Sequence, residues 1–355
     1  MIVPSGRNVA GYEQVLVFTD PPSGLHAIIA IHDTTLGPAL GGCRFWPYPD
    51  EDAALRDVLR LARGMTYKSA MAGLPLGGGK SVILGDPRRI KTPALMEAFG
   101  RCVAQLGGRY ITAEDVGTTP QDMACIRKAT PYVAGLTGPG YSGDPSPATA
   151  LGIFEGIRAA VRHRLGRDDL KGVHAAVQGL GAVGYKLCER LAAAGARLTV
   201  ADVNADATAR AAASFGAAIV APGAIYDVAA DLFAPCALGA VVNDATIGRL
   251  KVAIVAGSAN NQLAEDRHGA ELAARGILYA PDYVINAGGL INVAHEPLGR
   301  PDHPAYDREA AFAAVTRIGR TLAAIFERAD REGLPTSQVA DHIAEERLRS
   351  KRRAA

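Results

Sequence analysis

Val173-His174-Ala175-Ala176-Val177-Gln178-Gly179-Leu180-Gly181-Ala182-Val183-Gly184 is the stretch of sequence that decides the fold. Its last six residues match the pattern G-x-G-x-x-G, which follows an apolar run and opens an alanine-rich segment that reaches Ala194. A strand, a tight glycine turn and a helix in this order form the phosphate-binding unit of dinucleotide-binding folds. The stretch therefore predicts a parallel sheet that binds a dinucleotide.

Each glycine of this motif has its own physical task. Gly179 permits the tight turn, Gly181 lets a pyrophosphate approach the backbone, and Gly184 lets the helix pack closely on the strand. The N-terminus of the helix adds the positive end of a dipole. We therefore expect cofactor contacts from the whole motif: Gly179, Leu180, Gly181, Ala182, Val183 and Gly184.

An acidic residue follows the next predicted strand. The run from Arg197 to Val200 ends at Ala201-Asp202, about twenty residues beyond the motif. A carboxylate at this place accepts hydrogen bonds from ribose hydroxyls and repels a 2′-phosphate. Asp202 therefore favours NAD over NADP as the cofactor.

The character of the chain changes at its strongest cluster of turn-forming residues, between Gly135 and Pro147. Beyond this cluster, β-branched runs at 173–178, 198–202, 252–256 and 277–280 alternate with alanine-rich segments, which predicts a Rossmann-type, doubly wound sheet. The predicted domains are a substrate-binding and catalytic domain over 1–140, an NAD-binding domain over 141–330, and a C-terminal helix over 331–355 that can return to the first domain.

The first domain is predicted to be α/β with a mixed sheet, and we expect a cleft between it and the second domain. Apolar runs at 13–18 and 25–31 flank a proline-glycine turn and predict two strands, and 110–115 predicts another. Helical periodicity over 50–65 predicts a helix that leads to Lys68. Thr92-Pro93 predicts the start of a further helix. Two domains are expected because 355 residues exceed one ordinary core.

The first domain contains the run Gly77-Gly78-Gly79-Lys80, which follows the earlier lysine of Thr66-Tyr67-Lys68. Consecutive glycines let a backbone approach a ligand while presenting one amine, but taken alone such a run is more typical of a structural turn. It is not a phosphate loop of the form G-x-x-x-x-G-K-[ST], because Leu74 stands where the first glycine is required.

Composition argues against several classes of function. With 48% hydrophobic residues, 21% charged residues and a net charge of +2, the chain is globular and a poor candidate for binding nucleic acid. No stretch approaches the ~20 apolar residues of a membrane span, and the basic run 347–353 is typical of a solvated end. Five scattered cysteines predict reduced thiols in the cytoplasm, and no histidine cluster predicts a metal site.

The charged residues of the first domain suit hydride chemistry beside an anionic group. Lys68 offers a positive point charge for a carboxylate, Lys80 a possible acid or base, and Asp115 a proton carrier. A nicotinamide enzyme with such a domain would act on a carbon that bears an amine or an oxygen.

Five motifs carry a wider resemblance: Gly37-Pro38-Ala39-Leu40-Gly41-Gly42, Gly64-Met65-Thr66-Tyr67-Lys68, Leu76-Gly77-Gly78-Gly79-Lys80, Ala113-Glu114-Asp115-Val116-Gly117-Thr118 and Asn286-Ala287-Gly288-Gly289. Together they resemble the glutamate/leucine/phenylalanine/valine dehydrogenase family across nearly the whole chain. The resemblance implies that Lys80 is catalytic, that Lys68 binds the substrate α-carboxylate and that Asp115 is the acid. The other implied or predicted contacts are Gly41, Gly42 and Met65 for the substrate, Asn261 for substrate and nicotinamide, and Cys236, Ala237, Ala259 and Asn260 for the cofactor.

The implied reaction is the reversible oxidative deamination of an L-amino acid to a 2-oxo acid and ammonia, with no partner among nucleic acids or membranes. Lys80 would activate water and Asp115 would move protons on the leaving amine. Lys80 must be neutral for part of the cycle, since a cationic iminium would repel an ammonium. Members of the family are homo-oligomers, octamers among them.

Substrate choice is predicted to lie in an apolar pocket. By similarity the substrate side chain meets Leu40, Ala113, Leu290 and Val293. Glutamate is disfavoured because its γ-carboxylate would be buried unpaired, and branched aliphatic side chains rank above phenylalanine. The alternatives are an aromatic amino acid dehydrogenase and a non-catalytic NAD-binding sensor; the latter has little weight because Lys68, Lys80 and Asp115 are intact.

Overall fold

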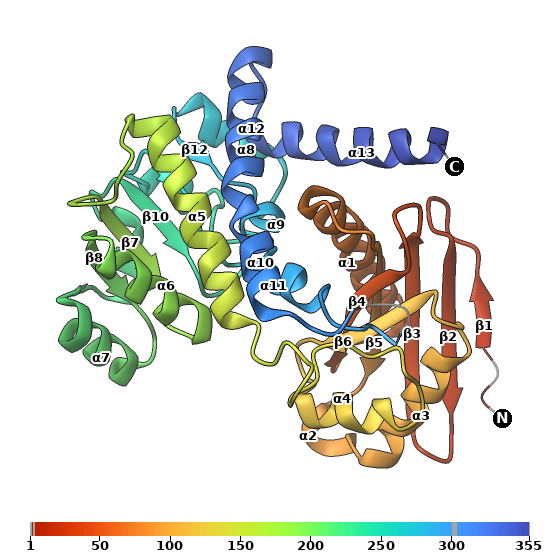
Figure 1. Cartoon of the computed structure of the whole chain (residues 1–355). Coiled ribbons are helices and arrows are strands. Elements are labelled where there is room, and N and C mark those ends of the chain that lie inside the picture. The colour runs from red at the N-terminus through yellow and green to blue at the C-terminus, as the bar shows by residue number, and fades with distance from the viewer. Residues whose placement is uncertain (1, 3, 300–303, 355) are drawn as a thin grey trace. The chain divides into compact units, whose positions relative to one another are not determined.

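The computed structural model describes residues 2, 4–299 and 304–354. The chain divides into two compact units. Unit 1 holds the described residues up to Asp144, those in Val293–Arg308 and those from Ala344 onward, and unit 2 holds Pro145–Asn292 and Glu309–Ile343. Figure 1 colours the elements of each unit by their place in the chain.

Unit 1 is built on one six-stranded sheet of order β1-β2-β3-β5-β4-β6. Strands β1, β2, β3 and β5 pair antiparallel, whereas β4 pairs parallel with β5 and β6, so the predicted mixed sheet is confirmed. Its elements are β1 Pro4–Arg7, β2 Gln14–Asp20, β3 Leu25–Asp33, β4 Ala39–Trp46, α1 Glu51–Ala72, β5 Gly77–Leu84, α2 Pro87–Ile90, α3 Pro93–Ala104, β6 Tyr110–Glu114 and α4 Pro120–Arg127.

Helix α1 is longer than its periodicity predicted. Asp50 caps its start by accepting a hydrogen bond from the Ala53 amide, and Gly73 ends it in the left-handed region. The prediction that the helix ends at Met65 was wrong, because buried Tyr67 and Met71 continue its apolar face. Lys68 therefore lies inside the helix.

The glycine run is a buried strand, so the turn interpretation was wrong. A Cβ on Gly77 would lie 2.1 Å from the Asp33 carbonyl oxygen, one on Gly78 would lie 2.0 Å from the Thr66 amide nitrogen, and one on Gly79 would lie 2.8 Å from the Tyr110 ring. Real side chains do not approach so closely, and the glycines let β5 pack against its neighbours. Lys80 is thus presented by a strand in the middle of the sheet.

The two faces of this sheet have separate cores. One cluster joins the sheet to α1 through residues such as Ile28, Val58 and Val82. The other, which includes Phe45 and Phe99, contains residues of the sheet, α3 and α4. Lys80 stands opposite Ala30 in the β3–β5 register, and Ala30 belongs to the α1 cluster, so Lys80 lies on the α1 face.

Unit 2 is the predicted doubly wound domain, and its fold class is confirmed. All neighbouring strands of its sheet are parallel, in the order β12-β11-β10-β7-β8-β9. Helix α12 packs along α5 (Figure 1). The elements from α5 onward, of which α10, α11 and α13 each have one end in unit 1, are α5 Ser146–Leu165, β7 His174–Gln178, α6 Ala182–Ala193, β8 Arg197–Ala201, α7 Ala205–Phe215, β9 Ala218–Ile219, η1 Pro222–Asp227, β10 Leu232–Pro235, η2 Ile247–Arg249, β11 Ile254–Val255, α8 Arg267–Ala274, β12 Leu278–Tyr279, α9 Asp282–Ile285, α10 Gly288–Val293, α11 Arg308–Val315, α12 Arg317–Glu332 and α13 Thr336–Ala354.

Two C-terminal segments, the described residues of Val293–Arg308 and those from Ala344 onward, group with unit 1. Glu296 accepts hydrogen bonds from the backbone amides of Gly135 and Ser142, which attaches the segment around Glu296 to unit 1. In the basic tail, Arg347 donates to the carbonyls of Ala70 and Met71 at the end of α1, and Arg352 pairs with Asp33. The tail is therefore anchored to unit 1 through two arginines, while the side chains of Arg347 and of residues 349–353 are exposed to solvent. Its last residue, Ala355, lies outside the described residues.

A search of the described residues finds no helix that is long and apolar enough to cross a membrane.

The glycine packing can be tested by a pair of alanine substitutions. We expect Gly78→Ala to destabilise unit 1 by roughly 1–3 kcal/mol or more, because the added methyl overlaps the backbone of α1. Gly64→Ala is the matched control: it lies on α1, and a Cβ there meets nothing within 4 Å. The control should keep or raise stability by about 0.5–1 kcal/mol. Differential scanning calorimetry compares them, and a Gly78→Ala protein as stable as the wild type would contradict the packing.

Candidate functional site

Lys80 and Asp115 form an ion pair within unit 1. The Nζ atom of Lys80 lies 2.6 Å from Oδ2 of Asp115, and Lys80 is only 6% exposed. Asp115 directly follows β6, and a Cβ on Gly42 would lie 2.8 Å from the Asp115 Cβ. Glycine at position 42 therefore lets the carboxylate approach the sheet and reach the amine.

Arg44 is a second cation on this carboxylate, and the sequence analysis missed it. Its Nε atom donates to Oδ2 of Asp115 at 3.2 Å. Burial alone would raise the pKa of Asp115, but Lys80 and Arg44 outweigh burial and hold that pKa below its usual value. Strand alternation could have pointed to Arg44, since it lies two residues beyond Gly42 and thus on the same face of β4.

Among the other predicted substrate residues, Leu40, Gly42 and Ala113 share the sheet face of Arg44, Gly41 alternates to the other face, and Met65 and Lys68 lie on α1. Leu40 stands opposite Gly78 and Ile111, and Gly42 stands opposite Ala113. The backbone of Gly41 packs against that of Gly79, where a Cβ would lie 1.8 Å from the carbonyl oxygen. Met65 and Lys68 project from α1, and both are partly exposed.

The two remaining pocket residues, Leu290 and Val293, lie on α10. Leu290 belongs to unit 2 and Val293 to unit 1, and both are buried. Their grouping with Leu40 and Ala113 stays a prediction.

The glycine motif in unit 2 has the geometry that a bound pyrophosphate needs. Gly179 has φ +94°, and a Cβ on Gly184 would lie 2.0 Å from the Gly179 carbonyl oxygen. Gly181 has open space around its Cβ position and begins α6 without a side-chain cap, so the first amides of the helix can meet an anion. A cavity of about 400 Å³ beside the motif is lined by Leu180, Gly181, Ala182, Tyr185, Lys186 and Arg210. The residues present therefore fit a dinucleotide.

The predicted cofactor residues Cys236 and Ala237 meet this motif. They follow β10, and a Cβ on Gly179 would lie 2.8 Å from the Ala237 Cβ, while one on Gly184 would lie 3.2 Å from the Cys236 Cβ. The loops after β7 and β10 thus lie together at the carboxyl ends of parallel strands, where such folds bind ligands.

Asp202 also supports the motif through its own hydrogen bonds. Its carboxylate accepts from the Leu180 amide at 2.5 Å and from the Asn204 amide at 2.7 Å. Sequence analysis missed two neighbours: Val203 is 93% exposed just after Asp202, and Leu238 is 80% exposed in the loop after β10. Such exposed aliphatic side chains can pack against a flat base.

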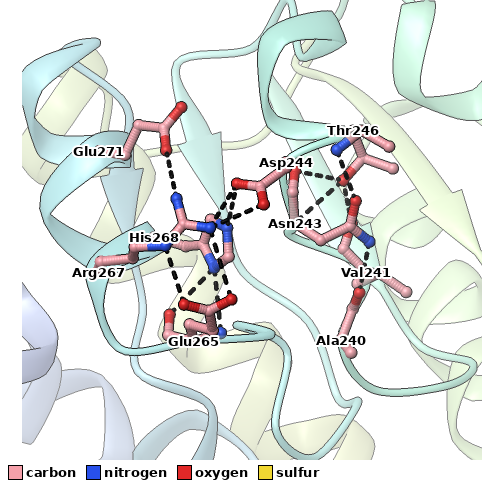
Figure 2. Close-up of polar contacts among 10 residues, drawn as sticks. Ala240, Val241, Asn243, Asp244, Thr246, Glu265, Arg267, His268 and Glu271 are labelled. Carbon is pink, nitrogen blue, oxygen red and sulfur yellow. Dashed lines mark hydrogen bonds and ion pairs between the residues drawn. The ribbon is translucent and has the colours of Figure 1, made fainter.

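The predicted segment Ala259–Asn261 is held by an adjoining loop. Asn261 has φ +50°, and its carbonyl accepts from the Ala240 amide at 2.7 Å. Arg267 bonds Asp244 at 2.6 Å and Glu265 at 2.9 Å, which ties the two loops together on their solvent side (Figure 2). The segment that carries Asn261 is therefore joined to the neighbouring loop by a backbone hydrogen bond, and an ion-pair cluster that the sequence did not predict joins the same two loops further along the chain.

The same cluster places three possible metal ligands near one another, with atoms of Asp244, His268 and Glu271 within 4.8 Å. The guanidinium of Arg267 already bonds Asp244 and lies 4.0 Å from Glu271 (Figure 2). This internal cation neutralises the carboxylates, so we assign the cluster a structural role.

Comparison with known proteins identifies the family. Residues 12–132 match the model described as Glu/Leu/Phe/Val dehydrogenase, dimerisation domain, and residues 200–353 match the model described as Glutamate/Leucine/Phenylalanine/Valine dehydrogenase. The chain is 55% identical over 340 residues to leucine dehydrogenase of Bacillus cereus, covering 96% of this chain and 91% of the relative.

Two further relatives act on aromatic amino acids by name. Phenylalanine dehydrogenase of Bacillus thermotolerans is 47% identical over 351 residues, which cover 97% of this chain and 90% of that one. The crystal structure of L-tryptophan dehydrogenase from Nostoc punctiforme matches with a TM-score of 0.84 and 47% identity, covering 96% of this chain and 97% of that one. The chain belongs to the glutamate/leucine/phenylalanine/valine dehydrogenase family, and the family resemblance drawn from its motifs is confirmed.

Proposed function

We propose that this protein catalyses the reversible, NAD-dependent oxidative deamination of a branched-chain L-amino acid to its 2-oxo acid and ammonia. The observation that carries the proposal is the ion pair between buried Lys80 and partly buried Asp115, whose charged atoms lie 2.6 Å apart. Such a pair can exchange protons with an amine, a hydroxyl and water at one carbon. The identity of 55% to a leucine dehydrogenase supports the choice of substrate class.

In the proposed reaction the residues of unit 1 bind the amino acid and move its protons. Lys68 binds the α-carboxylate, and the Lys80–Asp115 pair takes a proton from the substrate ammonium. When bound, the dinucleotide would supply the acceptor for the hydride that leaves Cα with its two electrons. The cationic iminium that remains requires a neutral Lys80, because two cations in contact repel each other.

Water then completes the deamination. As water adds to the iminium carbon, one of its protons passes to Lys80. Asp115 delivers a proton to the amino group, and the C–N bond breaks with its electron pair on nitrogen. Ammonia leaves, and the hydroxyl proton returns to the pair as the carbonyl forms. Each proton thus has a donor and an acceptor among the substrate, water, Lys80 and Asp115.

We assign the cofactor as NAD from the carboxylate of Asp202. A negative charge beside the glycine motif accepts ribose hydroxyls and disfavours a 2′-phosphate. The predicted contacts of Asn261 with the nicotinamide and of Asn260 with the cofactor belong to the same assignment.

The preferred side chain is proposed to be aliphatic. Leu40, Ala113, Leu290 and Val293 offer no cation for a second carboxylate, and one methylene changes binding in such a pocket by only ~1–3 kcal/mol. An aromatic substrate is the second candidate, supported by the 47% identity to a tryptophan dehydrogenase of known structure.

We further propose a homo-oligomer in the cytoplasm. The match to a dimerisation domain supports an assembly of identical chains, with an octamer as the finer proposal. The five cysteines are free thiols, which supports a reducing compartment.

The substrate proposal predicts a clear ranking in one assay. NADH formation at alkaline pH is followed with leucine, valine, isoleucine, phenylalanine, tryptophan and glutamate. We expect the highest kcat/KM for a branched aliphatic substrate and at least about a tenfold lower value for the aromatic ones. A higher kcat/KM for phenylalanine or tryptophan would establish the second candidate instead.

The catalytic assignment predicts that Lys80→Met loses turnover but not cofactor binding. We expect kcat to fall by on the order of 10²–10⁴, the usual contribution of a general acid–base group, while the affinity for NADH measured by fluorescence titration stays near that of the wild type. Lys128→Met is the matched control, because Lys128 is an exposed lysine paired with Glu97 in unit 1. Turnover that survives in Lys80→Met would refute the assignment.

The cofactor assignment predicts that Asp202→Ser lowers the preference for NAD. Removing the carboxylate ends its repulsion of a 2′-phosphate, so the ratio of kcat/KM for NAD to that for NADP should fall by about tenfold or more. NAD binding should weaken too, since the Leu180 amide loses its acceptor. Asp206→Ser, an exposed acid in the first turn of α7, serves as control. An unchanged ratio would rule out Asp202 as the selective residue.

A further inference from the structure

Arg44 is bonded on the side away from Asp115 by a second carboxylate. Its Nη1 atom donates to Oδ2 of Asp57 on α1 at 2.8 Å, and the Tyr48 hydroxyl donates to the same oxygen at 2.7 Å. Arg60 reaches Oδ1 of Asp57 at 3.1 Å from the solvent side. The guanidinium therefore has carboxylates on two edges, which fixes its plane.

These groups are largely removed from water. The side chains of Arg44, Asp57 and Asp115 are 22%, 17% and 20% exposed. Charges at this depth interact more strongly than surface ion pairs, and each loses stability when its partner is removed. Each charge in this group lies beside one of opposite sign, because the ion pairs connect Asp57 to Arg44, Arg44 to Asp115, and Asp115 to Lys80.

Both cations bond the same atom of Asp115. Lys80 and Arg44 each meet Oδ2, at 2.6 and 3.2 Å. In the proposed reaction Lys80 passes through a neutral state, whereas a guanidinium is always charged in a protein. When Lys80 is neutral, Arg44 is the cation that still faces Asp115.

The other titratable groups around this carboxylate make such a cation necessary. Glu114 lies next to Asp115, and its pKa is raised by burial and by the carboxylates of Asp122, Asp115 and Asp144. Asp122 on α4 is paired with Lys91. From β4, the buried Cys43 has its pKa raised to about 12 and contributes no charge. From α1, the carboxylate of Asp57 pairs with Arg44 and affects Asp115 only through that guanidinium. Negative neighbours and burial both favour a protonated Asp115.

We propose that Arg44 is a positioning residue for the reaction: bonded by Asp57 and Tyr48, it fixes the Asp115 carboxylate and favours its charged form, so that Asp115 gives up the proton that it carries to the leaving amino group. This inference rests on the proposed function of the Lys80–Asp115 pair. Arg44 itself moves no proton and acts through Asp115.

The test is the pH dependence of kcat/KM for leucine in Arg44→Met. The acid limb reports groups of the free enzyme that must lose a proton, and the two close groups titrate as a coupled pair. Removing a permanent cation favours the protonated pair, so the limb should move to higher pH by about 1–2 units. At pH values below the acid limbs of both proteins, kcat/KM of Arg44→Met should be about 10- to 100-fold lower than that of the wild type. On the alkaline plateau the difference should be much smaller.

Asp57→Asn is a nearly isosteric change that should shift the acid limb in the opposite direction from Arg44→Met. It removes a negative charge behind Arg44, so the acid limb should move to lower pH, by less than about one unit. Arg44→Lys keeps the charge but not the two-edged geometry, and its limb should lie closer to the wild type than that of Arg44→Met. Arg60→Met is the matched control, because Arg60 bonds the same Asp57 carboxylate but has a 57% exposed side chain; its limb should not move.

Two results would overturn the proposal. One is an Arg44→Met protein whose kcat falls equally at every pH with its acid limb in place, which is the behaviour of a purely structural ion pair. The other is an Asp57→Asn limb that stays or moves to higher pH, and this result applies even where Arg44→Met does not fold.

A measurement without substrate separates this inference from the proposed function. In protein labelled with ¹³C at the aspartate carboxyls, Asp115→Asn assigns the Asp115 resonance, and its titration gives the pKa directly. We expect that pKa to be higher in Arg44→Met than in the wild type; an equal value overturns the role of Arg44. An enzyme inactive on every amino acid would refute the proposed function, while the titration would still test Arg44.

Discussion

Contact between backbones at glycine is the constraint on which both units depend. In unit 1, β5 approaches α1 so closely that a methyl group on Gly78 would overlap the Thr66 amide, and Gly41 meets the Gly79 carbonyl in the same way. In unit 2, Gly184 brings α6 against the Gly179 carbonyl. Side chains of ordinary size would separate these elements. The positions of Lys80 on its strand and of the first α6 amides both follow from that close packing.

Buried charges in unit 1 can be retained because they occur in alternating order. An isolated ion at this depth would cost several kcal/mol of desolvation free energy, but Lys80, Asp115, Arg44 and Asp57 each contact an opposite charge. The sheet makes this possible by placing Arg44 and Lys80 on the same face of neighbouring strands. The proposed proton transfers at Lys80 and Asp115 therefore take place beside Arg44, whose charge does not change.

The parts of the fold that could be predicted were those with local rules. The glycine motif, its strand and its helix were recognised because each glycine has a separate steric reason, and Thr92 was recognised as a helix cap, confirmed by its bond to the Leu95 amide. Strand β10 was missed although it is central, because its four residues end in Pro235 and show no alternation when both faces are buried. The sequence likewise gave no local reason for Arg347 to bond the end of α1.

The candidate site shows the same division between local and distant information. Lys80 and Asp115 could be proposed from motifs, but Arg44, Asp57 and Tyr48 carry no motif of their own. Their relation depends on register: β4 and β5 must pair so that Arg44 stands opposite Val82, and α1 must cross that face at the level of Asp57. Register is a property of paired strands and is not encoded in any one segment.

Helix α1 links the stability of unit 1 to its chemistry. It provides Thr66 against the glycine strand, Asp57 against Arg44, and the terminal carbonyls that Arg347 of the C-terminal helix bonds. The same helix carries Lys68, the residue proposed to bind the substrate carboxylate. A shift of α1 along the sheet would change three things together: the distance between α1 and β5, the ion pair between Asp57 and Arg44, and the position of Lys68. Because all these contacts are made by one helix, a single position of α1 must satisfy both the packing of unit 1 and the proposed proton chemistry.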